Sequence, residues 1–245
     1  MITLIEELSM NAWPALQTQL YDGWVLRFAG GYTRRANCIN PLYPGKLALD
    51  EKMETCERIY REQKLPVIYK LTPDSLPPRL DAALEARGYA SEAPTSVQVL
   101  ALGGQAFKAR SEISLSRRLT EEWYVAFNRL SASKPATQAL HAKMLQAILP
   151  SCAFAAARVG GRIAGCGLAV EQNGYVGLYD ILVDPELRRQ GLGLSLMNSL
   201  LVWGQAQSAR TAYLQVMKDN PPALGLYARL GFREAYSYWY RVKRD

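Results

Sequence analysis

The sequence predicts an α/β protein of the α+β type, and three observations lead to that fold class. Hydrophobic residues make up 49% of the 245 residues and charged residues 21%, which is the composition of an ordinary globular protein. Segments with the period-two pattern of strands alternate along the chain with segments of helical periodicity. Tight-turn dipeptides join some strands directly, which indicates antiparallel hairpins. The length suits one large domain or two small ones.

The first half of the chain is expected to contain four strands and two helices. Residues 24–28 are rich in strand formers and are followed by Gly30-Gly31, a hairpin signal. From Leu49 onward, apolar side chains recur at i, i+4, i+7 and i+11, as on one face of a helix. In order, we expect strands at 24–28 and 36–43, a helix with Leu49, Met53, Cys56 and Tyr60 on one face, a strand at 67–69, a helix closed by Gly88, and a further strand.

The second half is longer and begins with two predicted helices. Gly160-Gly161 and Asn173-Gly174 are tight-hairpin dipeptides because glycine accepts positive φ, so they join three neighbouring strands. The expected elements are helices at 119–130 and 136–149, strands at 153–159, 162–171 and 175–183, a helix at 192–207, a strand at 212–217, a helix at 221–230 and a final strand at 236–242.

A domain boundary is predicted near residue 105, where a short glycine-containing stretch follows an apolar run. The two predicted domains are 1–105 and 106–245. Each contains one copy of a similar segment, at 77–89 and at 221–232. Both copies open with two prolines, suit the first turn of a helix, and end in glycine followed by an aromatic residue. The repeat indicates a duplicated fold.

Cysteine and histidine usage excludes several kinds of site. The four cysteines are far apart in sequence, which argues against a disulfide scaffold or a zinc cluster and favours reduced, buried thiols. A single histidine, His141, excludes sites that need several imidazoles. The first ten residues carry Glu6 and Glu7 where a signal peptide would be apolar, and the longest uncharged window, 190–209, contains several polar residues. We therefore expect a soluble, cytoplasmic protein without metal or membrane association.

Positive charge is concentrated in the second half. Residues 1–105 contain 11 Lys and Arg against 12 Asp and Glu, whereas residues 106–245 contain 18 against 10. A basic field of this kind can serve nucleic acid, anionic lipid or a polyanionic cofactor. No run of Lys and Arg is longer than two, so a nucleic-acid groove is not expected.

The segment 179–193 has the chemistry of an anion-binding turn. A buried strand leads through a proline turn into a basic, glycine-containing loop that opens a long helix. The first N–H groups of a helix lack intrahelical partners, and glycines let phosphate oxygens approach them. Two established phosphate loops are absent, because there is no G-x-x-x-x-G-K-[ST] and residue 196 is Leu where G-x-G-x-x-G needs glycine. An ordinary surface loop before a helix is the alternative interpretation.

The arrangement Arg188-x-x-Gly191-x-Gly193 after a strand resembles the Q/R-x-x-G-x-G/A signature of the GNAT superfamily of N-acyltransferases. Residues 226–232, Leu-Tyr-Ala-Arg-Leu-Gly-Phe, look like the family's second motif. The resemblance covers roughly residues 110–245. It implies a mixed, mostly antiparallel central sheet with flanking helices, and a smaller, degenerate GNAT-like domain at 1–105. That first copy has Leu84 where the second has Tyr227, so it is expected to be inactive.

The resemblance implies acetyl-CoA as co-substrate. The strand before the loop would pair with the pantetheine amides, the loop would hold the pyrophosphate, and Asn220 would lie at the cofactor or the strand gap. The residues implied in binding are Ile181, Leu182, Val183, Arg188, Arg189, Gln190, Gly191, Leu192, Gly193, Leu194 and Asn220.

Acyl transfer to an amine needs an acid for the departing thiolate, and Tyr227 is the candidate. The competing interpretation is that Tyr227 only packs its helix against the sheet. A backbone N–H near Val183 would meet the oxyanion. Asp180 and Glu171 are rival candidates for the general base, and each could instead be a solvated carboxylate at a strand end. We interpret His141 as a surface histidine and Cys166 as a small buried residue.

The predicted function is therefore acetyl-CoA-dependent N-acetyl transfer to a primary amine by direct attack. The acceptor could be a small molecule or a peptide, and a homodimer is possible. Two alternatives come from other classes: a non-catalytic acyl-CoA-binding regulatory module, and a nucleic-acid-binding protein that uses the basic second half.

Overall fold

The computed structural model describes residues 1–243 and divides them into two compact units. Unit 1 contains residues 1–96, 217–219 and 236–243, and unit 2 contains residues 97–216 and 220–235. The sequence-based division into 1–105 and 106–245 stays a prediction. The compact units separate earlier, after Ser96, and the strand from Tyr236 onward groups with unit 1.

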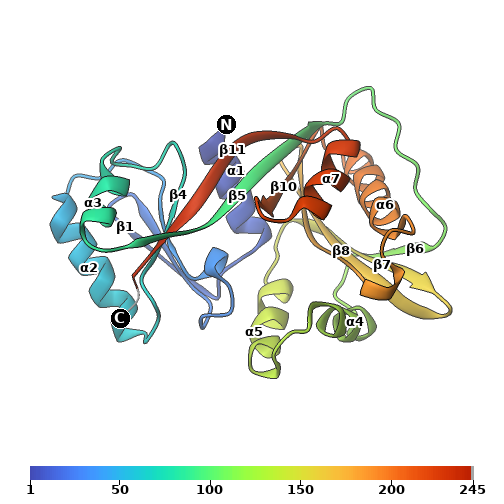
Figure 1. Ribbon diagram of the computed structural model, residues 1–245, viewed down its shortest axis with the longest axis horizontal. Coiled ribbons are helices and arrows are strands. Elements are labelled where there is room, and N and C mark those ends of the chain that lie inside the picture. The colour runs from blue at the N-terminus through green and yellow to red at the C-terminus, as the bar shows by residue number, and fades with distance from the viewer. Residues whose placement is uncertain (244–245) are drawn as a thin grey trace. The chain divides into compact units, whose positions relative to one another are not determined.

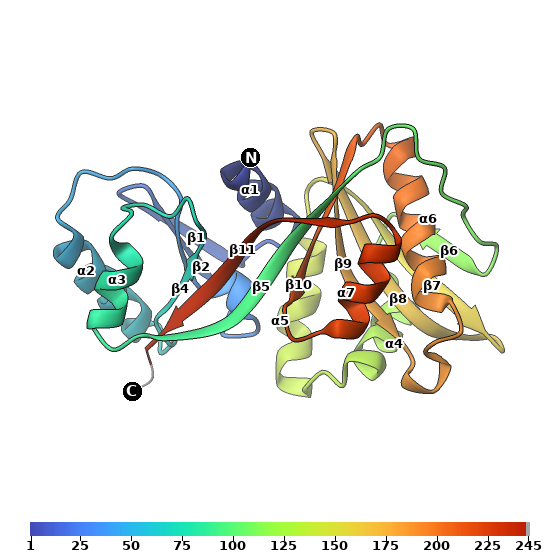
Figure 2. The same ribbon diagram turned by 45° about the horizontal axis from the view of Figure 1, so that its top comes forward.

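Unit 1 is a sheet flanked by helices. Its strands follow the order β1-β2-β3-β4-β11, with β3 parallel to β4 and the other neighbouring pairs antiparallel. Figures 1 and 2 show α2 and α3 together on one side of these strands. The elements are α1 (Ile2–Ala12), β1 (Gln17–Tyr21), β2 (Trp24–Phe28), a 3-10 turn (Arg34–Ala36), β3 (Ile39–Pro41), α2 (Leu49–Glu62), β4 (Ile68–Leu71), α3 (Leu80–Ala86), the start of β5 (Ala90–Ala101) and the end of β11 (Arg233–Val242).

The predicted apolar face of the first long helix is confirmed. Leu49, Met53, Cys56 and Tyr60 are all buried on α2 and belong to the same core cluster as Trp24 on β2. The expected strand at 36–43 is shorter, because a 3-10 turn occupies 34–36 and pairing with β2 is confined to residues 39–41. Neither α1 nor β1 was expected from the sequence.

Unit 2 is a mixed, mostly antiparallel sheet with helices on both faces, as predicted. Its strands follow the order β5-β10-β9-β8-β7-β6, in which β6 to β9 are antiparallel neighbours and β9 and β10 are parallel. Figures 1 and 2 show the strands between α6 and α7 on one side and α4 and α5 on the other. The elements are β6 (Ile113–Ser116), α4 (Glu121–Ser131), α5 (Pro135–Gln146), β7 (Ser151–Val159), β8 (Arg162–Gln172), β9 (Tyr175–Val183), a 3-10 turn (Pro185–Leu187), α6 (Leu192–Ala206), β10 (Thr211–Met217) and α7 (Pro221–Arg229).

Strand β8 shows how the two layers share the sheet. A Cβ on Gly165 would lie 3.0 Å from Leu196 on α6, and one on Gly167 would lie 3.0 Å from Leu200 on the same helix. The intervening Cys166 points to the other side, where its Sγ contacts the carbonyl oxygen of Trp123 on α4 at 3.9 Å. Alternate strand residues therefore face alternate helix layers, and glycines let α6 approach closely.

The sequence repeat is also a structural repeat. Helices α3 and α7 both end before a glycine in the left-handed region, Gly88 (φ 81°) and Gly231 (φ 91°). In each copy the next aromatic residue donates its backbone N–H at 3.0 Å to a helical carbonyl five residues back, from Tyr89 to Leu84 and from Phe232 to Tyr227. Both copies then enter a strand, β5 or β11, so the two segments fold into the same helix–turn–strand unit.

Within residues 1–243, no helix is long and apolar enough to cross a membrane.

Candidate active site

Strand β9 carries a bulge at Asp180. Tyr179 is opposite Leu168 on β8 and Leu182 is opposite Cys166, so Asp180 and Ile181 together face the single residue Gly167. Asp180 has φ +54°, in the left-handed region that residues other than glycine seldom adopt. The regular alternation of side chains along a strand therefore breaks at this point. Bulges of this kind redirect a side chain and end strand pairing.

Strands β9 and β10 stop pairing just before the bulge. Their parallel register runs from Tyr175 and Thr211 to Leu178 and Leu214, and both strands continue beyond it. Residues Ile181 to Val183 keep β8 as a neighbour on one side only, within the described part of the chain. Alternate N–H and C=O groups of such a half-paired strand point toward the missing neighbour, where an extended amide-containing ligand could bind.

The turn after β9 is fixed by an ion-paired aspartate. Asp184 is buried, accepts the backbone N–H of Glu186, and lies 3.2 Å from the guanidinium groups of both Arg129 and Arg162. The N–H of Glu186 and these two arginines hold the pKa of the Asp184 carboxyl below its usual value. The carboxylate therefore anchors the end of the strand from which the basic turn starts.

The basic turn presents a bare helix N-terminus. Arg189 (φ 64°) and Gly191 (φ 86°) both adopt the left-handed conformation, and Gly191 is the N-cap of α6 without any side-chain capping bond. The N–H groups of the first helical turn, at Leu192, Gly193 and Leu194, have no intrahelical partners by geometry. The helix dipole and these donors favour an anion at this position.

The two glycines of the turn have different roles. A Cβ on Gly191 would meet no atom within 4 Å, so glycine is needed here for the positive φ rather than for packing. A Cβ on Gly193 would make ordinary contacts with Leu226 at 3.4 Å and Val183 at 3.8 Å. The position that a Cβ would take on Gly191 is thus free of protein atoms. Arg188 lies beside the turn, and its Nε donates to the carbonyl of Val183 at 3.4 Å.

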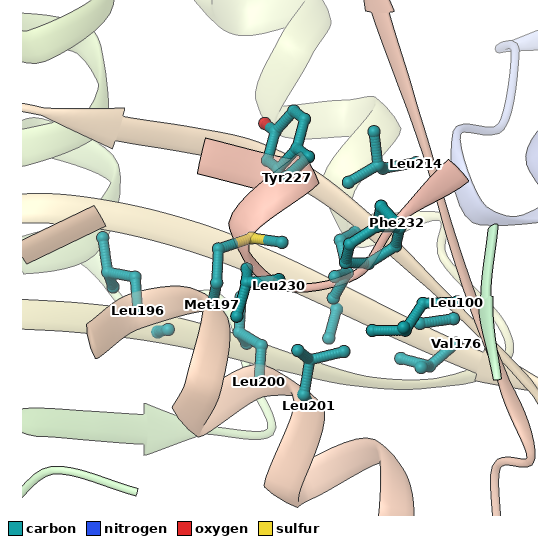
Figure 3. Packing of buried hydrophobic residues seen from close by; sticks show 14 of the residues in the cluster. Leu100, Val176, Leu196, Met197, Leu200, Leu201, Leu214, Tyr227, Leu230 and Phe232 are labelled. Atoms are coloured by element: carbon teal, nitrogen blue, oxygen red, sulfur yellow. The ribbon is translucent and has the colours of Figure 1, made fainter. Parts of the chain in front are cut away.

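Tyr227 on α7 is largely buried in the core cluster of unit 2. Its ring packs edge-on against Phe232, with centroids 6.0 Å apart, and burial raises its pKa to about 12. Figure 3 shows its hydroxyl oxygen on the side of the ring away from Leu230 and Met197. The ring therefore packs as the competing interpretation expected, while the protonated hydroxyl points out of the cluster. The amide of Asn220 accepts the N–H of Ala223 and caps α7.

The structure separates the two candidate bases. Glu171 is opposite Val176, at the end of β9 remote from the turn, and its Oε1 accepts the N–H of Gly174 at 3.0 Å. Asp180 lies four residues further along β9, ~13 Å away at ordinary strand rise. Asp180 is therefore the carboxylate near the strand gap. The role of each residue in catalysis stays a prediction.

The expectation that His141 lies at the surface is wrong. The side chain is 1% exposed on α5, and its Nε2 is 3.6 Å from the Oδ2 of Asp180. The sequence did contain a signal, since His141, Met144 and Leu145 stand at i, i+3 and i+4 and are together the buried residues of α5. A histidine at this spacing lies on the apolar face of its helix.

Cys166 is buried as expected, and burial raises the pKa of its thiol to about 12. A thiol with so high a pKa carries almost no thiolate near neutral pH, and thiolate is the nucleophilic form. Cys166 is therefore a poor nucleophile in this environment.

Comparisons with known proteins agree with this geometry. The sequence profile of a family described as "Probable histone acetyltransferase Rv0428c C-terminal" matches residues 1–241. The uncharacterized N-acetyltransferase YobR of Bacillus subtilis is 28% identical over 251 residues, which is 99% of this chain and 99% of YobR. The ribosomal protein bS18-alanine N-acetyltransferase of Escherichia coli strain K12 is 41% identical over 58 residues, 24% of this chain and 39% of that protein.

Solved structures show the same fold. A GCN5-related N-acetyltransferase from Kribbella flavida superposes with a TM-score of 0.74 at 12% identity, covering 99% of this chain and 95% of that one. A tandem GNAT protein from the clavulanic acid biosynthesis pathway gives 0.65 at 16% identity, covering 100% of this chain and 89% of that one.

The bulged strand, its half-paired end and the glycine turn that follows are those of an acyltransferase of the GNAT superfamily, here with the helix–turn–strand unit in tandem. Within that superfamily, the chain belongs to the Rv0428c C-terminal acetyltransferase family.

Proposed function

We propose that the protein transfers an acetyl group from acetyl-CoA to a primary amine by direct attack. The observation that carries the proposal is the N-terminus of α6, which no side chain caps and where a Cβ on Gly191 would meet no protein atom, in the turn that follows a half-paired strand. Acetyl-CoA would supply a thioester whose carbonyl carbon is open to an amine. The diphosphate would occupy the turn from Arg188 to Leu194, and the pantetheine amides would lie along residues 181–183.

In this proposal, groups of the chain accept and donate the protons and stabilise the charge that develops during transfer. Asp180 takes the proton that the amine loses as the C–N bond forms, directly or through one water. A main-chain N–H of residues 181–183 donates to the oxygen on which negative charge develops. Tyr227 donates its hydroxyl proton toward sulfur as the C–S bond breaks. Its pKa of about 12 keeps it protonated, and therefore a donor, at neutral pH.

We also propose that residues 1–105 form a degenerate copy without a cofactor site. Leu84 stands in α3 where Tyr227 stands in α7, and it is fully buried in the core of unit 1. A leucine there has no proton to donate.

The experiment is a titration followed by an activity screen. Calorimetry measures acetyl-CoA binding to the whole chain, and thiol release is then followed with small-molecule amines, amino acids, peptide N-termini and lysine peptides. The partly exposed free thiol of Cys152 can react with the same reagent, so enzyme without acceptor is the blank. We expect saturable binding and turnover with at least one acceptor class. No binding would refute the proposal, and binding without transfer would favour a non-catalytic module.

A further inference from the structure

The single histidine of the chain is buried against the strained aspartate of the bulge. The imidazole of His141 is enclosed by two aromatic rings of α4, with centroid distances of 4.5 Å to Phe127 and 5.8 Å to Tyr124. Its Nε2 faces the Oδ2 of Asp180 at 3.6 Å. That separation is within ion-pair range and slightly longer than a hydrogen bond.

Asp180 combines two features that are costly to the fold. Its left-handed φ of +54° is unfavourable for a residue with a Cβ. Its Oδ2 is buried and has no hydrogen-bond partner among the described residues, although its side chain as a whole keeps 12% exposure. The remaining exposure therefore belongs to the other side-chain atoms. The bulge turns one carboxylate oxygen inward to the imidazole.

Three other polar groups around this pair have partners of their own. Tyr124 donates its hydroxyl to the carbonyl of Gln138. Arg129 is held by Asp184 and by the carbonyl of Ile163, and Cys166 contacts the carbonyl of Trp123. The imidazole of His141 is thus the group that can donate an N–H to the buried oxygen of Asp180.

We propose that His141 is a positioning residue, which holds the Oδ2 of Asp180 so that the other carboxylate oxygen is directed to the acceptor amine. This inference rests on the proposed function. With 1% exposure, His141 does not touch substrate and acts through Asp180. Shortening the contact by about half an ångström would bring Nε2 and Oδ2 to hydrogen-bond distance, and apo sites often tighten in this way when substrate binds.

The kinetic test compares three variants in the full chain with the best acceptor from the screen. His141→Leu removes the donor, His141→Gln replaces it with an amide N–H, and Met144→Ala opens the same buried face of α5 without removing a polar group. We expect kcat to fall ~10- to 100-fold in His141→Leu, with the KM for acetyl-CoA within threefold, and to recover largely in His141→Gln. Met144→Ala should lower Tm but keep kcat. Equal losses of kcat in His141→Leu and Met144→Ala would overturn the proposal.

A second test needs no activity. One histidine gives one set of imidazole signals in an NMR spectrum of histidine-labelled protein. We expect Asp180→Asn to move these signals in the unliganded chain, and the surface control Glu122→Gln, which loses only an ion pair to Arg158, to leave them in place. Unmoved signals in Asp180→Asn would overturn this inference alone. Failure of the wild-type chain to acetylate any amine would overturn the proposed function and the inference with it.

Discussion

Tyr227 packs in the core, and its hydroxyl keeps its proton near neutral pH. Its ring lies in the core cluster of unit 2. Burial raises the pKa of its hydroxyl to about 12, so the hydroxyl stays protonated at neutral pH. Removing the oxygen alone therefore tests the chemistry while the packing is kept.

We expect Tyr227→Phe to lower kcat ~100-fold, because the departing thiolate loses its donor, with little change in acetyl-CoA affinity or Tm. Steady-state kinetics measures kcat, and calorimetry measures the affinity for acetyl-CoA. Below pH 10, the wild-type rate should show no loss that arises from ionisation of Tyr227, since its pKa lies higher. Unchanged turnover in Tyr227→Phe would remove this residue from the mechanism.

Gly191 offers a sharper test of the turn, because a side chain there would meet only a ligand. We expect Gly191→Val to weaken acetyl-CoA binding at least tenfold in a calorimetric titration. Gly174→Val is the matched control: its φ of +81° resembles the +86° of Gly191, and its Cβ also meets no atom within 4 Å, but it lies at the far end of β9.

Both glycine variants should lose similar stability, ~1–3 kcal/mol, from the unfavourable φ. Equal acetyl-CoA affinity in the two variants would show that the turn at Gly191 does not contact the nucleotide.

Helices α6 and α7 each contain an interior glycine, and the two differ in their surroundings. A Cβ on Gly204 of α6 would lie 2.8 Å from Val176 on β9, whereas a Cβ on Gly225 of α7 would meet nothing. Gly204 lets α6 approach the sheet closely, whereas the packing of α7 does not require a glycine at position 225.

We expect Gly225→Ala to raise the free energy of unfolding by ~0.5–1 kcal/mol, through helix propensity alone. Gly204→Ala should lower it, because overpacking costs ~1–3 kcal/mol and outweighs the same gain. Urea denaturation of both variants measures the difference. An equal gain in both would mean that α6 does not approach β9 as closely as described.

Elements with strong local signals were predicted well, and weakly patterned ones were not. The hairpin glycines and the two-proline helix start defined β7 to β9 and α7 closely. Strand β1 was missed because its residues are polar or exposed throughout, and β6 because it has only four residues. The turn before α6 was predicted from Arg188, Gly191 and Gly193, and anion binding there stays a prediction. The contact of His141 with Asp180 was not predicted, because it depends on a bulge in β9 and joins residues that are distant in sequence.

Across the whole molecule, buried thiols link stability to alkaline pH. Burial raises the pKa of Cys38 to about 11 and that of Cys56 and Cys166 to about 12, from an ordinary value of 9.0. Since the folded-state values are raised, the stability is fully present below pH 9 and is lost as pH rises toward 12.

We therefore expect the free energy of unfolding, measured with urea, to fall between pH 9 and pH 11. A variant with alanine at these three cysteines should lose less over the same interval. Buried tyrosines with raised pKa values, such as Tyr89 and Tyr240, will keep some of the dependence. A wild-type free energy that stays constant up to pH 11 would contradict the burial of these thiols.

Unit 1 is completed by a strand from far along the sequence. Residues 239–242 of β11 pair with β4, and both Trp239 and Arg241 bind the carboxylate of Asp81. We expect a fragment of residues 1–105 to give little native signal by circular dichroism and NMR. The same fragment joined through a flexible linker to residues 233–243 should fold. A fragment 1–105 that folds equally well without the strand would show that β11 is dispensable for unit 1.

The position of that strand also affects folding during translation. Amino-terminal domains usually fold first as they leave the ribosome, at ~5–20 residues per second. Here β4 of unit 1 has no partner on one side until a strand about 140 residues later is synthesised. At that rate, the interval lasts roughly 7–28 s. Chaperones that cover exposed strand edges would have their main opportunity in this interval.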